Sequence, residues 1–232
     1  MEKTKTGIKG LDELIQGGFP LGSRILLSGT PGTGKTIFGL EYLHNGAKRF
    51  DEPGLYVSFE EESENIREQA SQFGWNLKEL ERQQILIIIS IPPSEITNNT
   101  IADIIHIIEK HKIKRLVIDS ISTLSLNTPS MHVNANFINE FAVKHFIYSF
   151  IDRLKKLKNT TTLLISHAHD NDFSKDYISE FISDGIIHIT FESMGGEFSR
   201  SLLIRKMRRT KNDEDIHPLE ISNKGIIIHN IK

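Results

Sequence analysis

Eight consecutive residues near the N-terminus combine glycines with a lysine and a threonine. The stretch Gly29-Thr30-Pro31-Gly32-Thr33-Gly34-Lys35-Thr36 fits the pattern G-x-x-x-x-G-K-[ST]. Glycines let the backbone wrap around an anion, so several N–H groups and the N-terminus of the following helix can point at one phosphate. Lys35 can reach the β- and γ-phosphates of a nucleotide, and the Thr36 hydroxyl can ligate Mg²⁺. The motif therefore predicts binding of ATP or GTP.

The neighbouring residues give this loop the setting that its chemistry requires. The apolar run 24–28 predicts a buried strand, and residues 37–45 have helical spacing, beginning with Ile37 beside the loop. A strand, a loop and a helix in this order are what the phosphate-binding motif needs. A glycine-rich turn with a surface lysine is the alternative, but a chance match in a chain of this length has odds on the order of one in a hundred.

Acidic residues at the ends of two other apolar runs could complete a hydrolytic site, which needs an acid near the metal and a base for water. Asp119 ends the run 115–119, which suits a carboxylate that holds Mg²⁺ through water; capping a turn is its structural alternative. Glu60 and Glu61 follow the run 55–59, and the carboxyl ends of parallel strands face the ligand crevice. We favour Glu60 as the base with Glu61 assisting, although both could simply begin the next helix.

The composition excludes several classes of protein. A chain of 232 residues is long enough for one α/β domain with a sizeable core. Its net charge of −2 gives no overall basic footprint for nucleic acid, and the absence of cysteine excludes disulfides, thiolate zinc sites and cysteine nucleophiles. No apolar run approaches the roughly 18 residues of a membrane span and no signal peptide is evident, so we expect a cytoplasmic protein without a membrane partner.

Further apolar runs alternate with helical patterns along most of the chain. Residues 84–90 and 161–166 predict strands, while 63–73, with Ser63 as its cap, and 136–157 predict helices. Isoleucines at helical spacing predict another helix around residues 101–108. Strands that are apolar on both faces and alternate with helices predict an α/β fold with a mostly parallel sheet covered on both sides.

In roughly the last fifty residues the alternation of strands and helices stops. Residues 185–191, 199–206, 216–221 and 225–229 read as consecutive strands without helices between them, so we expect antiparallel additions at the sheet edge. No internal repeat or low-complexity linker is evident. The sequence therefore predicts a single domain over residues 1–232.

Several short motifs, taken in chain order, resemble the KaiC-like branch of the RecA-fold P-loop ATPases. They are residues 6–12, 17–20, 28–36, 57–61, 73–75, 117–120 and 206–208. The resemblance covers nearly the whole chain. It implies a sheet in which the fifth strand lies between the first and the fourth, and it implies that paired glutamates such as Glu60 and Glu61 are the hydrolytic bases.

The same resemblance implies that a neighbouring subunit completes the site. In that family a Lys-x-Arg at the end of a late strand reaches the neighbour's nucleotide, so Lys206 and Arg208 would act in trans from an edge strand as charge stabilisers for the leaving phosphate. An ATP-dependent homo-oligomer follows, with a hexamer as the family expectation. Met207, Thr210 and Asn223 would lie near the base and ribose. Ser166 and His167, at the end of the fifth strand, would lie where the fold places a polar residue that senses the γ-phosphate.

The sequence also departs from this family pattern. Arg209 replaces a usual glycine, and residues 129–143 are longer than the usual connection. Glu180 and Phe181 stand where an autokinase domain of the family carries adjacent serine and threonine phosphoacceptors, so a kinase is the least expected function. Residues 167–170, His-Ala-His-Asp, resemble a metal-binding pattern, but no further cluster completes a site and a sensing or loop role is favoured.

Two functions remain open. The first is a slow Mg²⁺-dependent ATPase with its active site at a subunit interface. The second is a recombinase-paralogue-like regulator or adaptor that binds ATP but works through protein partners or DNA. A basic stretch serves both readings equally, as an active site in trans, a DNA contact or a solvated edge: Arg200, Arg205, Lys206, Arg208, Arg209 and Lys211.

Overall fold

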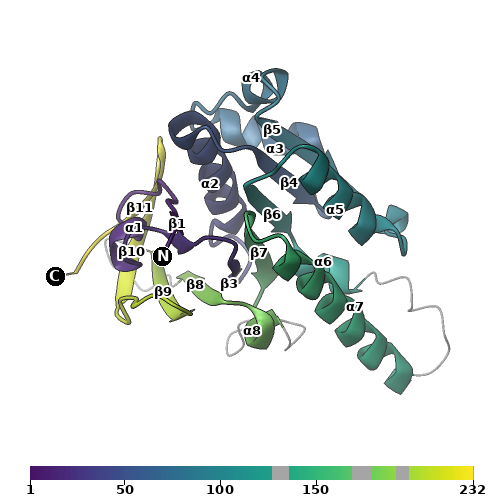
Figure 1. Cartoon of the computed structure of the whole chain (residues 1–232). Helices are drawn as coiled ribbons and strands as arrows, with labels where there is room; N and C mark the ends of the chain where they lie inside the picture. The colour runs from purple at the N-terminus through teal and green to yellow at the C-terminus, as the bar shows by residue number, and fades with distance from the viewer. Residues whose placement is uncertain (127–135, 169–178, 192–198, 232) are drawn as a thin grey trace.

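The computed structural model describes residues 1–126, 136–168, 179–191 and 199–231, with only the backbone described over 136–142. Within these residues nine strands form one sheet, in the order β11-β10-β9-β8-β3-β7-β6-β4-β5 (Figure 1). The parallel strands are β3 (Arg24–Gly29), β4 (Gly54–Ser58), β5 (Leu86–Ser90), β6 (Arg115–Asp119), β7 (Thr161–His167) and β8 (Gly185–Phe191). The antiparallel strands are β9 (Arg200–Met207), β10 (Ile216–Ser222) and β11 (Gly225–Ile228).

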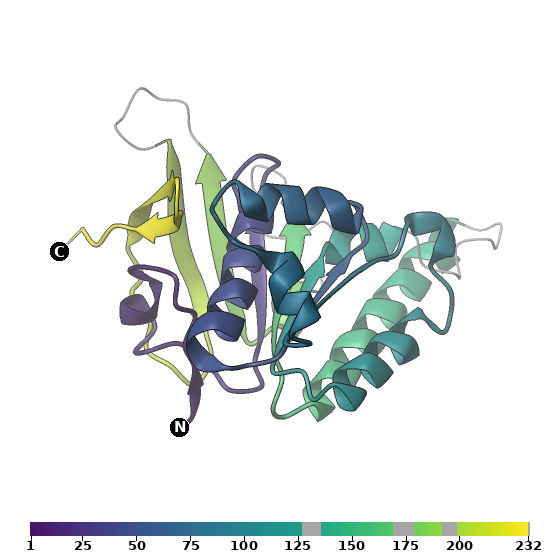
Figure 2. The ribbon, with the colours of Figure 1, turned by 90° about the horizontal axis from the view of Figure 1, so that it is seen from above.

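Helices cover both faces of this sheet, because its strands present apolar side chains alternately to the two sides. Ile25 and Leu27 of β3 join the core under α2 (Lys35–Phe50) and α3 (Ser63–Ser71), whereas Leu26 joins the core under α5 (Thr100–Lys110) and α7 (Asn136–Lys156). Both ribbon views show α5 and α7 side by side at the end of the sheet opposite β9–β11 (Figures 1 and 2).

Shorter elements fill the connections. A two-stranded antiparallel sheet pairs β1 (Lys3–Thr4) with β2 (Phe19–Pro20). The short helices are α1 (Leu11–Leu14), α4 (Leu77–Arg82), the 3₁₀ turn Pro93–Glu95, α6 (Ile121–Leu126) and α8 (Ser179–Ile182). Of these, α4, α6, α8 and the 3₁₀ turn were not predicted from the sequence, because each has at most six residues and shows no extended periodicity.

The parallel centre of the sheet agrees with the sequence analysis. β7 lies between β3 and β6, as the family resemblance implied. Because β3, β4, β6 and β7 run the same way, their carboxyl ends meet at one edge of the sheet, where ligands of α/β proteins bind. We call this the carboxyl edge, and the opposite side, where these strands begin, the amino edge.

Two expectations about the late strands are wrong. β8 was expected to be antiparallel, but it pairs in parallel with β3, since residues 168–184 are long enough to return the chain to the amino edge. The antiparallel addition therefore begins at β9. Lys206 was expected on an edge strand, but β9 is flanked by β8 and β10, and the edge belongs to β11.

The expected cap of helix α3 is also wrong. Ser63 is the first residue of the helix, and Glu62 occupies the N-cap position without a side-chain cap hydrogen bond. Acidic residues at this end of a helix are stabilised by the helix dipole, so the helix can begin there without a serine cap.

Candidate nucleotide-binding site

The predicted phosphate-binding loop opens onto a cavity of about 360 Å³ at the carboxyl edge. The strand β3 ends at Gly29 and helix α2 begins at Lys35, so the loop joins a buried strand to a helix N-terminus. The cavity walls come from this loop, from the ends of β4, β6 and β7, and from β9 and β10. Its lining residues are Pro31, Gly32, Gly34, Lys35, Thr36, Ile37, Glu60, Glu61, Gln69, Asp119, His167, Arg200 and Ile221.

Within the loop, the backbone adopts a conformation that favours glycine at Gly34. Its φ is 98°, in the left-handed region, and a Cβ there would lie 2.7 Å from Cδ1 of Ile221. Lys35 is buried, and its Nζ donates hydrogen bonds of 2.8 Å to the carbonyl oxygens of both Gly29 and Thr30. Burial lowers the pKa of this amine, while the carboxylates of Asp119 and Glu60 oppose that effect. The loop thus holds its lysine beside the space where a phosphate would enter.

The predicted metal ligands are in contact with each other. Thr36 Oγ1 donates a 2.8 Å hydrogen bond to Oδ2 of Asp119, and the hydroxyl of Tyr56 donates a 2.5 Å bond to the same oxygen. Burial raises the pKa of the Asp119 carboxyl, and these two hydrogen bonds oppose the rise. A hydroxyl and a carboxylate are hard oxygen donors, so the pair fits Mg²⁺. Tyr56 was not predicted as a site residue, because the pairing of β4 with β6 is what brings its hydroxyl to Asp119.

Glu60 is the centre of a hydrogen-bond network. Its Oε1 accepts hydrogen bonds from the hydroxyls of Ser120 and Thr123 and lies 2.8 Å from Nε2 of His167. Partial burial alone would raise the pKa of Glu60, but the hydrogen bonds, that from His167 first, lower it to about 2. Glu60 is therefore a carboxylate at neutral pH, held in one position by three partners.

Further side chains line the cavity, and some of them were not predicted from the sequence. Glu61 lines the cavity as expected, and Nε2 of Gln69, in α3, donates a hydrogen bond to its carboxylate. Arg200 reaches the loop from the start of β9, donating to the carbonyl of Gly32 at 3.2 Å. Its guanidinium also lies 4.8 Å from the ring centroid of Phe191. Arg200 and Ile221 arrive from strands that were expected to be antiparallel, but the sequence did not specify which end of each strand lies beside the loop.

Some predicted contacts do not line this cavity. Thr33 is buried and donates to the carbonyl of Thr30 instead, and Ser166 is buried against the hydroxyl of Ser122 at 3.1 Å. Gly29 and Thr30 contribute their carbonyl oxygens to Lys35 from outside the lining. Three late residues are also absent from the lining of the cavity: Met207, Thr210 and Asn223.

Lys206 and Arg208 lie at the amino edge, at the far end of the sheet from the loop. Lys206 Nζ donates to the carbonyl of Ser183 at 2.8 Å, and the N–H of Arg208 donates to the carbonyl of Asp184 at 2.8 Å. Asp184 immediately precedes β8, whose parallel partner β3 ends at the phosphate-binding loop. The two cations are therefore separated from the loop of their own chain by the length of a strand.

At this amino edge Arg208 belongs to a second, basic cavity of about 660 Å³. Arg24 and Asp184 form a buried ion pair at its base. Arg209, in the position of the family's usual glycine, adopts a left-handed φ of 64°, so the turn forms despite the side chain. The residues that line the cavity are Leu21, Gly22, Arg24, Lys155, Lys158, Asp184, Arg208 and Arg209.

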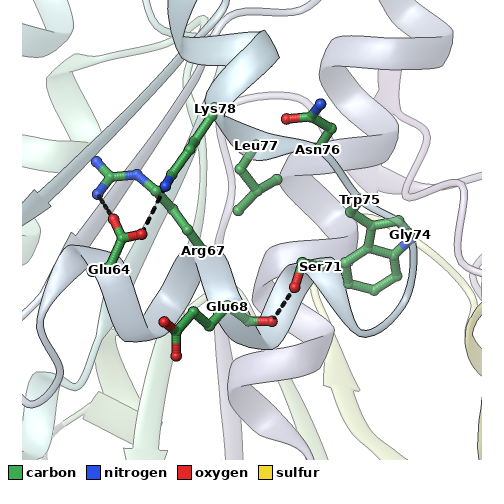
Figure 3. A pocket seen from close by; sticks show the side chains of 9 residues that line it. All are labelled: Glu64, Arg67, Glu68, Ser71, Gly74, Trp75, Asn76, Leu77 and Lys78. Carbon is green, nitrogen blue, oxygen red and sulfur yellow. Dashed lines mark hydrogen bonds and ion pairs between the residues drawn. The ribbon is translucent and has the colours of Figure 1, made fainter.

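A third hollow, of about 370 Å³, lies between α3 and α4 (Figure 3). Glu64 pairs with both Arg67 and Lys78, at 3.2 and 2.7 Å, so its charge is compensated (Figure 3). None of the residues lining it was predicted to bind a nucleotide. We therefore assign the nucleotide to the loop cavity.

Two further sequence predictions fall partly outside the described residues. His169 and Asp170 of the H-x-H-D pattern are not described, and the residues that are described contain no group of three or more metal-ligating side chains. Much of the stretch 129–143 also lies outside. Glu180 and Phe181 are described, in α8, with Phe181 exposed. In the described part of the chain no helix is long and apolar enough to cross a membrane.

Comparison with known proteins identifies the family. A family model described as the KaiC ATPase matches residues 4–232. The circadian clock oscillator protein KaiC of Parasynechococcus marenigrum is 35% identical over 98% of this chain, which spans 45% of that relative. A UPF0273 protein of Aeropyrum pernix is 34% identical, with 99% of this chain and 94% of the relative covered.

A solved structure agrees with this assignment. A KaiC-like protein of Pyrococcus horikoshii superimposes with a TM-score of 0.86 and 32% identity, covering 99% of both chains. The chain spans less than half the length of the clock proteins it matches, but nearly all of the UPF0273 relative and of this KaiC-like structure. Its RecA-like sheet, its phosphate-binding loop and these matches together place the chain in the KaiC ATPase family.

Proposed function

We propose that this chain is a single-domain Mg²⁺-dependent ATP-binding protein that hydrolyses ATP slowly, in a site that a second copy completes. The observation that carries the proposal is that the expected catalytic groups lie at opposite ends of the sheet. Lys35, Thr36, Asp119 and Glu60 converge on one cavity at the carboxyl edge, whereas Arg208 lies at the amino edge. A chain that keeps these groups at opposite ends can combine them only through a neighbour.

The residues of the loop cavity have distinct tasks in this proposal. Lys35 exchanges the carbonyl oxygens of Gly29 and Thr30 for the β- and γ-phosphates. Thr36 and Asp119 would hold Mg²⁺, which would neutralise phosphate charge when bound. Glu60 orients the attacking water and accepts its proton; because its three donors all use Oε1, we assign Oε2 to the water. A carboxylate with a pKa of about 2 is a weak base, in keeping with slow turnover.

Charge complementarity supports a head-to-tail contact between copies. The carboxyl edge presents Glu60 and Glu61 beside the loop, whereas five cations and one acid, Asp184, line the basic cavity. Such a contact joins two different surfaces, so it forms either a closed ring or an open filament. We propose a ring, and the hexamer remains the expectation from the family resemblance.

The names of the relatives limit what can be carried over. The clock oscillator proteins are about twice as long as this chain, so a role in a clock is not part of the proposal. Autophosphorylation is not part of it either, because Glu180 and Phe181 have no hydroxyl to accept a phosphate.

A mixing experiment tests the proposal. The variant Lys35→Ala lacks its own phosphate site but can donate Arg208, while Arg208→Ala has the site but lacks the donor. Each should be inactive alone, and mixing the two should restore part of the ATPase activity. Arg205→Ala, which changes an exposed arginine of the same strand, is the matched control and should remain active. A mixture that stays inactive although the two variants co-assemble would contradict the role of Arg208 in trans.

A further inference from the structure

The hairpin of β10 and β11 contacts the phosphate-binding loop with one strand and helix α2 with the other. Ile221, near the end of β10, lines the loop cavity and packs against Gly34. Directly opposite Ile221 in the hairpin register stands Ile226. The N–H of Ile226 donates a 2.6 Å hydrogen bond to Oε2 of Glu41, in α2. One cross-strand pair thus connects a wall of the cavity to a carboxylate in the helix that follows the loop.

Glu41 is unusual because it is an acidic residue with only 6% of its surface exposed. Buried carboxylates are costly unless hydrogen bonds compensate them. From its own helix Glu41 faces Asn45 and Arg49, and from β11 it faces the backbone of Ile226 and Gly225. A Cβ on Gly225 would lie 2.6 Å from the Glu41 carboxylate, so the contact also depends on a glycine with a φ of 131°. None of the steps assigned above uses this carboxylate.

We propose that Glu41 is a positioning residue of the nucleotide site, which holds the β10–β11 hairpin so that Ile221 closes the cavity over the phosphate-binding loop. Helix α2 begins at Lys35 and contains Glu41, so the last two residues of the loop motif, Lys35 and Thr36, and the anchor of the hairpin belong to one helix. The nucleotide part of this inference rests on the proposed function; the anchoring of the hairpin does not.

The protonation of Glu41 should modulate this anchoring near neutral pH. Burial raises the pKa of the carboxyl to about 7, against the opposing effects of the Ile226 hydrogen bond and of Arg49. The packed hairpin therefore prefers protonated Glu41, and ionisation favours states in which the hairpin has moved away and water reaches the carboxylate.

Two measurements on purified full-length protein test the inference. The first is hydrogen exchange of the Ile226 amide, followed by NMR without nucleotide, which should become faster in Glu41→Ala but not in Glu41→Gln, because the amide oxygen of glutamine still accepts the bond. The second is the affinity for a fluorescent ATP derivative with Mg²⁺. Loss of one such hydrogen bond corresponds to about a tenfold weaker affinity in Glu41→Ala.

A double-mutant cycle and a matched control sharpen the affinity measurement. Ile221→Ala should weaken binding to a similar degree, and the double variant should be little worse than either single variant, because both act on one wall. Glu220→Gln is the control: it makes the same chemical change on the same hairpin, at a partly exposed carboxylate paired with His229, and should bind as wild type. Between pH 6 and 8 wild type should lose affinity severalfold relative to Glu41→Gln, a ratio that cancels the titration of ATP itself.

The outcomes separate this inference from the proposed function. If wild type binds the ATP derivative and Glu41→Ala, shown to be folded by its thermal transition, binds it equally well, the positioning role is wrong. If Glu41→Ala does not fold, Gly225→Ala displaces the hairpin without removing the carboxylate, and normal affinity in that variant would equally overturn the inference. Failure of wild type to bind ATP would instead contradict the proposed function, and the exchange of the Ile226 amide would still decide whether Glu41 anchors the hairpin.

Discussion

Nε2 of His167, the last residue of β7, lies 2.8 Å from Oε1 of Glu60, the second residue after β4. The two residues are 107 positions apart in the chain, and β6 separates their strands in the sheet. The contact joins the residue that we assign to water activation with the position where the family resemblance expects a sensor of the γ-phosphate. Under the proposed function, His167 would report on the nucleotide through the orientation of Glu60.

A first prediction follows from this pair. His167→Ala should lower ATP turnover roughly tenfold, since Glu60 loses a donor that fixes its position, while ATP affinity should change little. His167→Gln keeps an N–H donor and should recover part of the rate. Steady-state ATPase assays on the three proteins measure this. Equal loss in both variants would show that the imidazole acts by something other than hydrogen bonding to Glu60.

The second prediction concerns Glu60 itself. Glu60→Gln keeps the size of the side chain but removes the base, so turnover should fall by at least roughly tenfold with ATP binding retained. Glu62→Gln, in the adjacent N-cap position of α3, is the control and should keep its rate. Unchanged turnover in Glu60→Gln would move the role to Glu61, the other carboxylate of the cavity.

The third prediction concerns Lys35. Lys35→Ala should abolish detectable ATP binding in calorimetric titration, because the loop loses the charge that meets the phosphates. Thermal unfolding of the nucleotide-free protein should stay near that of wild type, since Nζ donates its hydrogen bonds to two loop carbonyls and is attracted to the Asp119 and Glu60 carboxylates through space. Lys48→Ala changes an exposed lysine of the same helix and should bind normally. Normal ATP binding by Lys35→Ala would refute the loop assignment.

The fourth prediction is an absence of phosphorylation. After long incubation with Mg-ATP, intact-mass spectrometry should detect no protein heavier by one phosphate group. Glu180 and Phe181 cannot accept phosphate, and the nearby hydroxyls of Ser179 and Ser183 are buried in and after α8. A stoichiometric adduct would revive the kinase alternative.

The fifth prediction concerns stability and pH. The pKa of Glu41 is raised from 4.5 to about 7 in the fold, so its contribution to stability is fully present below pH 4.5 and is lost as pH rises to about 7. Relative to Glu41→Gln, wild type should therefore lose up to about 3 kcal/mol of unfolding free energy across that window. Urea unfolding at pH 5 and pH 8, followed by the fluorescence of the single tryptophan, measures the difference. An identical pH dependence in both proteins would contradict the buried state of Glu41.

The sequence was sufficient for the parts of the site that are local. The loop is a continuous motif, and Asp119 and Glu60 were found because they follow apolar strands whose carboxyl ends share one edge in a parallel sheet. The contact between Glu60 and His167 required the order of strands, which a single sequence does not contain. Arg200 and Ile221 were missed as cavity walls for a related reason: their strands run antiparallel, so the direction of each strand decides whether a residue lies near the loop or at the far edge.

The placement of Arg208 and the loop at opposite ends of the sheet gives a head-to-tail assembly that uses both a direction. An open head-to-tail row would always leave one terminal loop without a donor and one terminal arginine without a nucleotide, whatever its length. Among head-to-tail assemblies only closure provides every loop with a donor, so under the proposed ring and the proposed role of Arg208 the hydrolytic rate per chain becomes a measure of how completely the ring is closed.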